Sequence, residues 1–245
     1  MKANISLFYL ALLASFVLLV SPALAAPSQR AQAPSFGWVE EVFVDYSHAG
    51  PGPHPSTESD NFHLTQGGIK WPTGATIKYT VSSSGCSNDC AGAVSEVDSA
   101  FDAWELGVIT YTRDDGSPDT NPCTGLPNSV SWSSIDGSGG ALAVASVCRN
   151  VATKVIGGFR ILYDTAETWS DSGDAGKFDI RNVGAHEAGH VSGLDHTNAP
   201  QDGCLTMYRF AGPGETQKQT LGLGDKLGMQ FLYGSTDVTP GSCGS

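Results

Sequence analysis

The sequence predicts an α+β domain in which strands pack on helices. Residues 77–81 (Ile-Lys-Tyr-Thr-Val) alternate in polarity and are rich in β-formers, as in a half-buried strand. Val94, Val97, Phe101 and Trp104 follow one another at spacings of three, four and three residues, which places them on one helix face. The order strand, helix, several strands, helix, helix favours an α+β arrangement.

The first helix is expected to begin near Ser87 or Asn88, either of which can cap its N-terminus, and to run to about Leu106. Residues 114–127 are rich in Asp, Gly, Ser and Pro and therefore predict turns. Further strands are expected at residues 108–112, 130–132, 141–147 and 159–163, and further helices at about 178–192 and 224–233.

The composition indicates a globular acidic protein. Hydrophobic residues make up 40% of the 245 positions and charged residues 16%, which argues against disorder. The 13 Lys and Arg against 25 Asp and Glu give a formal net charge of −12. Nucleic acid is excluded as an expected partner because phosphate binding needs a basic surface.

The N-terminus is typical of a secretory signal peptide covering residues 1–25. Lys2 is followed by an apolar run from Ile5 to Val20 and by the small-residue triplet Ala23-Leu24-Ala25. A membrane anchor is the alternative, but the run is shorter than the roughly 20 residues that a spanning helix needs. We expect cleavage after Ala25 or Ala26, secretion, and no membrane attachment afterwards.

Residues 26–67 are rich in Pro, Ser and Gly, and only Trp38–Tyr46 alternates enough to predict a strand. We interpret this segment as loosely structured and as a candidate propeptide. Residues 235–245 are expected to form a C-terminal tail.

Six cysteines in a secreted chain favour three disulfides over free thiols. A zinc–thiolate site is the alternative, but the chain has no CxxC pair. Fifteen pairings are possible in principle. Pairing of nearest neighbours predicts Cys86–Cys90, Cys123–Cys148 and Cys204–Cys243.

Residues 186–196 match the pattern HExxHxxGxxH. His186 and His190 lie one helical turn apart, so both imidazoles can bind one metal ion, and Glu187 can reach a water on that metal. Gly193 can end the helix in a left-handed conformation, which lets the chain turn back and bring in His196. Three imidazoles leave a fourth position open, as a catalytic zinc requires. The other histidines, His48, His54 and His63, are expected to be solvated loop residues.

From about Lys70 to Gly234 the chain resembles the metzincin zinc endopeptidases, and among them the matrixins. The segments that carry the resemblance are 70–81, 100–112, 142–145, 163–169, 206–208 and 224–234. The resemblance implies a metzincin-type α+β fold over residues 68–234, with a twisted mixed sheet packed on helices, an active-site helix and a Met-turn. Met207 would then lie below the zinc.

The resemblance also implies where substrate binds. Leu142, Ala143, Val144 and Ala145 match the edge strand that pairs with extended substrate in that family, and Tyr208 begins the loop to Leu223 that is expected to wall the neighbouring pocket. The expected partner is a peptide or protein substrate, and the expected protein is a monomer.

Two features of the family are missing. Val144 and Leu162 stand where matrixins have histidines for a second, structural zinc, so that site is not expected. Residues 26–70 contain no cysteine, so the family's cysteine-switch latency cannot operate.

Asp45 and Asp60 could cap the zinc in principle, but both are expected to be ordinary exposed carboxylates.

Calcium is a candidate second metal. Asp114, Asp115 and Asp136 lie in Asp- and Gly-rich stretches that could hold it, although such clusters are usually solvated turns.

The sequence therefore favours a secreted zinc endopeptidase in which Glu187 acts as general base. Two alternatives stay open, a catalytically inactive metzincin-like protein and a disulfide-stapled extracellular binding module without metal. A zinc assay and a peptide-cleavage assay separate the three.

Overall fold

The computed structural model describes residues 37–47 and 58–241, and every structural statement below refers to them. The predicted signal peptide, residues 48–57 with His48 and His54, and Cys243 lie outside the described residues. No helix of the described ranges is both long and apolar enough to span a membrane.

A seven-stranded mixed sheet with strand order β11-β1-β6-β7-β5-β3-β4 forms the main layer of the fold. Strands β4, β3, β5 and β7 run parallel, and β6 runs antiparallel to β7. Its strands are β1 (Trp38–Ser47), β3 (Thr76–Ser82), β4 (Thr110–Arg113), β5 (Ser129–Ser133), β6 (Ala141–Asn150), β7 (Ile156–Asp164) and β11 (Phe210–Ala211).

Two small sheets complete the strand pairing of the described residues. β2 (His63–Leu64) pairs antiparallel with β10 (Leu194–Asp195), and β8 (Trp169–Ser170) pairs parallel with β9 (Phe178–Asp179). This β2–β10 pairing holds the backbone of Leu194 and Asp195 in place, directly before His196.

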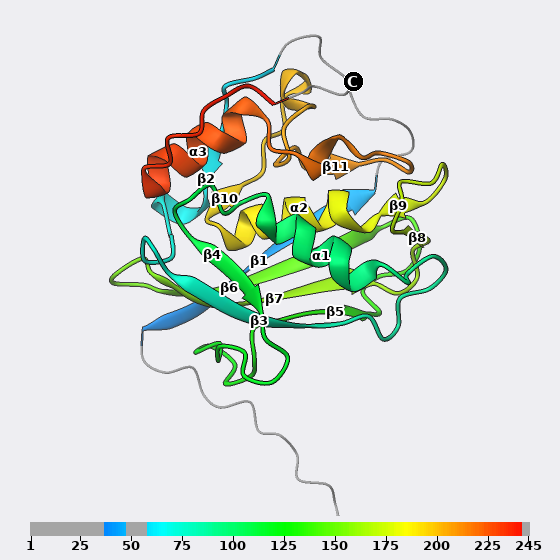
Figure 1. Ribbon diagram of the computed structural model, residues 1–245, viewed down its shortest axis with the longest axis horizontal. Helices are drawn as coiled ribbons and strands as arrows, with labels where there is room; N and C mark the ends of the chain where they lie inside the picture. Colours follow the sequence, from blue (N-terminus) through cyan, green and yellow to red (C-terminus); the bar gives the residue numbers. More distant parts are fainter. Residues whose placement is uncertain (1–36, 48–57, 242–245) are drawn as a thin grey trace, which may run out of the picture. The chain divides into compact units, whose positions relative to one another are not determined.

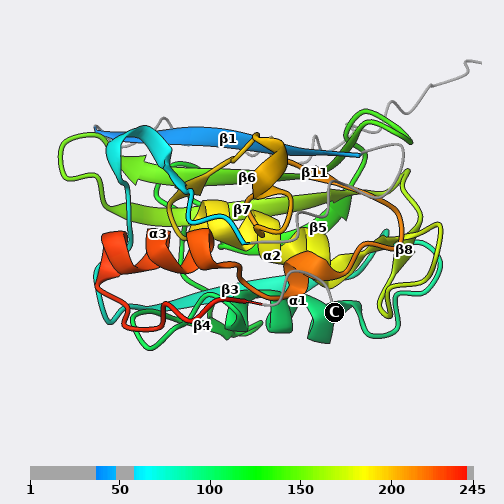
Figure 2. The same ribbon diagram turned by 90° about the horizontal axis from the view of Figure 1, so that it is seen from above.

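Helices α1 (Ala93–Asp102) and α2 (Ile180–Val191) lie side by side on one face of the sheet (Figures 1 and 2). The hydroxyl of Tyr163 on β7 donates to the carbonyl of Ile180, which ties the sheet to the start of α2. The third helix is α3 (Leu223–Tyr233), and single 3-10 turns are η1 (Thr65–Gly67), η2 (Pro200–Asp202) and η3 (Gln217–Gln219). The α+β prediction is confirmed.

Helix α1 is shorter than predicted, because it begins at Ala93 rather than at Ser87 or Asn88 and ends before Leu106. The Cys86–Cys90 disulfide closes a short loop there, and Asn88 has a φ of 74°, which is incompatible with a helix. The carboxylate of Asp171 instead accepts the backbone N–H of Gly92 at the helix start.

Two of the three predicted disulfides are confirmed, Cys86–Cys90 and Cys123–Cys148. The second joins the turn-rich segment before β5 to the buried end of β6. The third predicted pair cannot be followed because Cys243 is outside the described residues.

The predicted edge position of residues 141–147 is wrong for this chain. β6 pairs with β7 on one side and, on the other, antiparallel with β1 from Trp38 to Tyr46. β1 then pairs parallel with β11 through Tyr46 and Ser47. The stretch from Trp38 is therefore an ordered strand, as its alternation predicted, and not a loose segment.

Candidate active site

Helix α2 brings His186, Glu187 and His190 together in the interior, where each side chain has no exposed surface. Gly193 follows the helix with a φ of 100°, and a Cβ there would collide with the carbonyl oxygen of Ile69. Only glycine fits this turn without strain. The chain then reverses through β10 and brings His196 to the same place, as the motif predicted.

The three imidazoles converge through their Nε2 atoms. The Nε2 atom of His190 lies 3.2 Å from that of His186 and 3.2 Å from that of His196. The Nδ1 atom of His186 donates to the carbonyl of Thr206 at 2.7 Å, and that of His190 to the carbonyl of Leu194 at 2.9 Å. Both Nε2 atoms therefore carry lone pairs that point into the cluster.

This geometry fits zinc. Tetrahedral Zn–N bonds of about 2.0–2.1 Å place neighbouring ligand nitrogens about 3.3 Å apart, close to the spacing here. Burial, followed by the mutual repulsion that a neighbouring imidazole would exert if both rings were protonated, lowers the pKa of His186 and His190 well below the usual value. Burial also lowers the pKa of His196 to about 4. The imidazoles are therefore neutral, which is the form that binds metal.

Glu187 lies beside this cluster with both carboxylate oxygens buried and without a hydrogen-bond partner among the described residues. Burial, and next the nearby carboxylate of Asp45, raise the pKa of Glu187 well above its ordinary value. A carboxylate with raised proton affinity beside a metal site suits a general base.

Met207 lies directly below the active-site helix. A Cβ at Gly189, between the two helical histidines, would collide with the Met207 sulfur and lie 2.6 Å from the Trp104 ring. The backbone N–H groups of Thr206 and Met207 donate to the carboxylate of Asp225 at 2.7 and 3.1 Å. The turn is thus fixed to α3, and its Thr206 carbonyl in turn orients His186.

The predicted substrate strand is next to this cluster, but β1 covers it. Ala143 of β6 pairs with Asp45, and Ala145 pairs with Phe43. The ring of Phe43 stacks on His190 with centroids 4.3 Å apart and an interplanar angle of 11°. Leu142 is buried and Val144 half-buried in the same strand, and Tyr208 is buried on the other side of β1.

The expectation that Asp45 is exposed is wrong. Asp45 is the one buried residue of β1, with 0% of its surface exposed, whereas Val42 in the same strand is 59% exposed. Neither of its carboxylate oxygens has a hydrogen-bond partner among the described residues. Burial raises the pKa of Asp45 to about 7, against an opposing attraction from Lys218. Asp60 is exposed, as expected.

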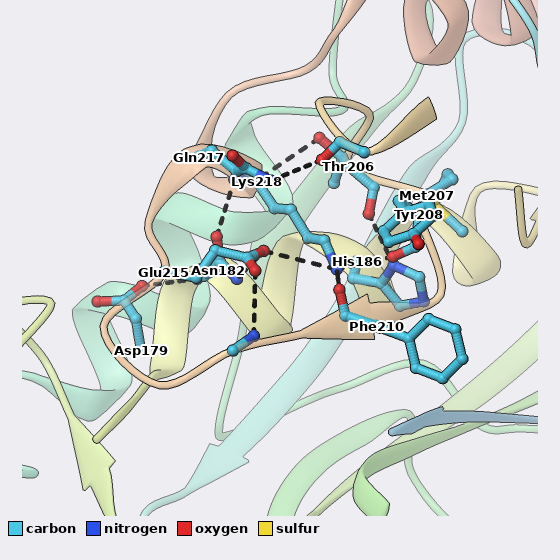
Figure 3. A network of polar contacts seen from close by, with 12 residues as sticks. Asp179, Asn182, His186, Thr206, Met207, Tyr208, Phe210, Glu215, Gln217 and Lys218 are labelled. Atoms are coloured by element: carbon cyan, nitrogen blue, oxygen red, sulfur yellow. Dashed lines mark hydrogen bonds and ion pairs between the residues drawn. The ribbon is translucent and has the colours of Figure 1, made fainter. Parts of the chain in front are cut away.

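A buried lysine, Lys218, organises the segment on the far side of β1 (Figure 3). Its Nζ donates to the carbonyls of Tyr208 and Phe210, both at 2.7 Å, and lies 3.7 Å from the carboxylate of Glu215. The side chain of Asn182 on α2 accepts the backbone N–H of Lys218. This residue could not be found from the sequence, because a lysine in a Gln- and Thr-rich stretch is typical of an exposed turn.

The calcium candidates contact protein groups. Asp114 pairs with Lys78 at 2.9 Å and Asp115 with Arg113 at 2.6 Å, and Asp136 accepts the backbone N–H of Ala141. Within the described ranges, the three histidines form the one cluster of three or more potential metal ligands. His63 is exposed, as predicted, but it lies in strand β2 rather than in a loop, and its Nδ1 atom contacts the carbonyl oxygen of His196.

A mixed sheet backed by a helix with this ligand geometry, and with a methionine turn below it, defines the metzincin class of zinc endopeptidase domains. Comparison with known proteins narrows the class. The matrixin family model matches residues 70–234, and the chain belongs to the matrixin family. Matrixins are zinc-dependent metalloendopeptidases that usually also bind calcium.

Individual relatives match parts of the chain. Rat stromelysin-3 is 40% identical over 107 residues, or 44% of this chain and 19% of the relative. Human matrix metalloproteinase-25 is 39% identical over 80 residues, which is 32% of this chain and 14% of the relative. Human neutrophil collagenase is 28% identical over 179 residues, which is 72% of this chain and 36% of the relative. The matches thus span between 14% and 36% of these relatives' own lengths.

Proposed function

We propose that this chain is a secreted zinc endopeptidase that hydrolyses peptide bonds in peptide or protein substrates. The observation that carries the proposal is the convergence of three neutral imidazoles, with the Nε2 atom of His190 3.2 Å from that of each of the other two, beside the buried carboxylate of Glu187. Secretion is supported by the N-terminal apolar run and by two disulfides, which persist in oxidising compartments.

His186, His190 and His196 would hold the zinc ion. When bound, zinc supplies Lewis acidity, which polarises the substrate carbonyl and lowers the pKa of a water toward about 7. Glu187 takes a proton from the attacking water and delivers it to the leaving amine. Met207 supports the helix between the two helical ligands and keeps their spacing.

Substrate would bind as an extended strand between β6 and β11, where main-chain hydrogen bonds are available on both sides. Leu142, Ala143, Val144 and Ala145 would line one side, and Tyr208 the other. In this proposal residues 68–234 form the catalytic domain of a monomer, and calcium serves as a structural metal.

The segment 26–67 acts as a propeptide in this proposal. Its strand β1 lies where substrate would bind and covers the candidate site. The interpretation is supported by the stacking of Phe43 on His190. The proteolytic form would arise when this segment leaves the site, and mass spectrometry of active protein should find residues 38–47 cleaved off.

The proposal is tested with Glu187→Ala. The variant should bind zinc as the parent does, by elemental analysis, but cleave a mixed peptide library at least about 100-fold more slowly. His190→Ala should lose the metal, and Asp102→Ala, at an exposed position of α1, should change neither property. Unchanged cleavage by Glu187→Ala would refute the role of this carboxylate.

A further inference from the structure

The turn at residues 191–195, which brings His196 to the other two candidate zinc ligands, is held by Thr65. The backbone N–H of Thr65 donates to the carbonyl of Gly193 at 3.1 Å, and its hydroxyl donates to the carbonyl of Leu194 at 3.0 Å. Thr65 is only 1% exposed. These bonds fix the turn, because breaking a buried hydrogen bond leaves polar groups without a partner.

The carbonyl of Leu194 has a second donor, the imidazole of His190. The Nδ1 atom of His190 lies 2.9 Å from the same oxygen. A carbonyl oxygen has two lone pairs, so the hydroxyl of Thr65 and the imidazole occupy both. Thr65 therefore fixes the direction of the acceptor that orients His190. Loss of its hydroxyl would let the carbonyl and the imidazole turn together.

Strand β2 supports the third candidate ligand in the same way. It pairs antiparallel with β10, the strand directly before His196, and places His63 opposite Asp195 (Figure 1). The Nδ1 atom of His63 lies 2.7 Å from the carbonyl oxygen of His196. The nitrogen is the donor, because a carbonyl oxygen only accepts. Residues 63–65 thus hold the backbone on which two of the three imidazoles depend.

The residues before β2 tie this stretch to the C-terminal half of the chain. The side chains of Ser59 and Asn61 donate to the carboxylate of Asp202 in η2, at 2.6 and 3.0 Å. Asp202 is fully buried. The carboxylate of Glu58 accepts the backbone N–H of Leu223, the first residue of α3, at 3.2 Å. The chain from Glu58 onward is therefore built into the domain that carries the candidate zinc site.

We propose that Thr65 and His63 are positioning residues of the zinc site, and that they stay with the enzyme when β1 leaves. The inference rests on the proposed function and moves the start of its catalytic domain from residue 68 to residue 58. β1 covers the site through Phe43, which stacks on His190. Residues 58–67 have the opposite effect, because they hold the ligands in place.

Thr65→Val tests the hydroxyl in the whole chain, because valine keeps the branched shape of threonine. Partners outside the ligand set typically change metal affinity 10–100-fold, so zinc should bind at least about tenfold more weakly, by competition with a chelator. Thr65→Ser keeps the donor and should restore most of this affinity. The control is Thr80→Val on β3, which loses a hydroxyl bonded to Asp115. Equal zinc affinity of Thr65→Val and the parent would overturn the proposal.

His63→Phe tests the second contact at an exposed position, where the change leaves the fold intact even if Thr65→Val does not fold. The variant keeps a ring but loses the donor to His196. Zinc is spectroscopically silent, so cobalt is bound in its place, since its visible spectrum depends on ligand geometry. The spectrum should change in His63→Phe and return toward that of the parent in His63→Asn, whose amide can donate. An unchanged spectrum in His63→Phe would refute the positioning role of β2.

Mass spectrometry of the processed protein tests which residues stay. Residues 38–47 should be absent, and residues 58–69 should remain in one chain with His196. Active protein that lacks Thr65 would overturn the inference and leave the proposed function standing. A chain whose Thr65→Val variant binds zinc at least about tenfold more weakly, but which cuts no peptide, would refute the proposed function and leave the positioning role standing.

Discussion

Main-chain carbonyls orient the two imidazoles of the active-site helix. The carbonyls of Thr206 and Leu194 accept the Nδ1–H groups of His186 and His190, which fixes the tautomer that leaves each Nε2 free. The orientation of these two candidate ligands therefore depends on backbone groups outside the proposed ligand set. Glycines at two positions allow this arrangement, Gly189 inside the helix and Gly193 after it.

Gly189→Ala tests how tightly the helix is packed. The added methyl group would collide with the Met207 sulfur and the Trp104 ring, so we expect a loss of about 1–3 kcal/mol in unfolding free energy. Denaturant unfolding measures it. Gly116→Ala is the control, because its Cβ would have no neighbour closer than 3.7 Å. Equal stability of the two variants would show that the helix is less tightly packed than described.

At the scale of elements, the methionine turn is held by α3. The carboxylate of Asp225 accepts backbone N–H groups from Thr206, Met207 and Gly222. Asp225→Asn would replace one acceptor oxygen with a donor that faces these groups. We expect about 1–3 kcal/mol lower stability and weaker zinc binding, measured by unfolding and by competition with a chelator. A stable variant that binds zinc as tightly as the parent would exclude this coupling.

The loop before β6 is ordered by Asp164, whose buried carboxylate accepts the backbone N–H groups of Ala166, Asp136 and Gly137. Burial opposes ionisation, but these donors outweigh it and hold the pKa of Asp164 below its ordinary value. The ionised group therefore stabilises the fold above its unfolded pKa of about 3.9, and this contribution is lost as the pH falls through the lower folded value.

Asp164→Asn should accordingly be less stable than the parent by about 1–3 kcal/mol at neutral pH, and the difference should shrink below about pH 4. Unfolding free energies measured from pH 7 to pH 3 check this, with Asp60→Asn at an exposed position as the control. A difference that stays constant across this range would mean that the Asp164 charge does not stabilise the loop.

At the scale of the whole molecule, local patterns predicted most elements. Each successful pattern involves residues that are close together in the sequence. Examples are the alternation at residues 77–81, the helix spacing of Val97 and Phe101, and the HExxHxxGxxH motif. The strand at Trp38–Tyr46 was also predicted from its alternation. Its pairing with strands β6 and β11 was not predicted, because this pairing joins residues about 100 to 165 positions apart.

The same dependence on distant contacts explains why the burial of Asp45 and of Lys218 was not predicted. Asp45 is buried because β1 crosses the metal cluster, and Lys218 is buried because η3 folds under β11. Both side chains are polar, Asp45 at a position of a predicted strand that was expected to be exposed and Lys218 in a segment typical of a solvated turn. Only the tertiary arrangement places both charges in the interior.

We propose that one zinc ion on three imidazoles, with Glu187 beside it, supports peptide-bond cleavage by this chain. Metal-free protein whose strand β1 has been removed by processing, as verified by mass spectrometry, should be titrated with zinc while peptide cleavage is followed. We expect a cleavage rate that rises in proportion to the added zinc and levels off at one equivalent per chain. Cleavage by metal-free protein, or a fully zinc-loaded chain that cleaves no peptide or protein, would contradict it.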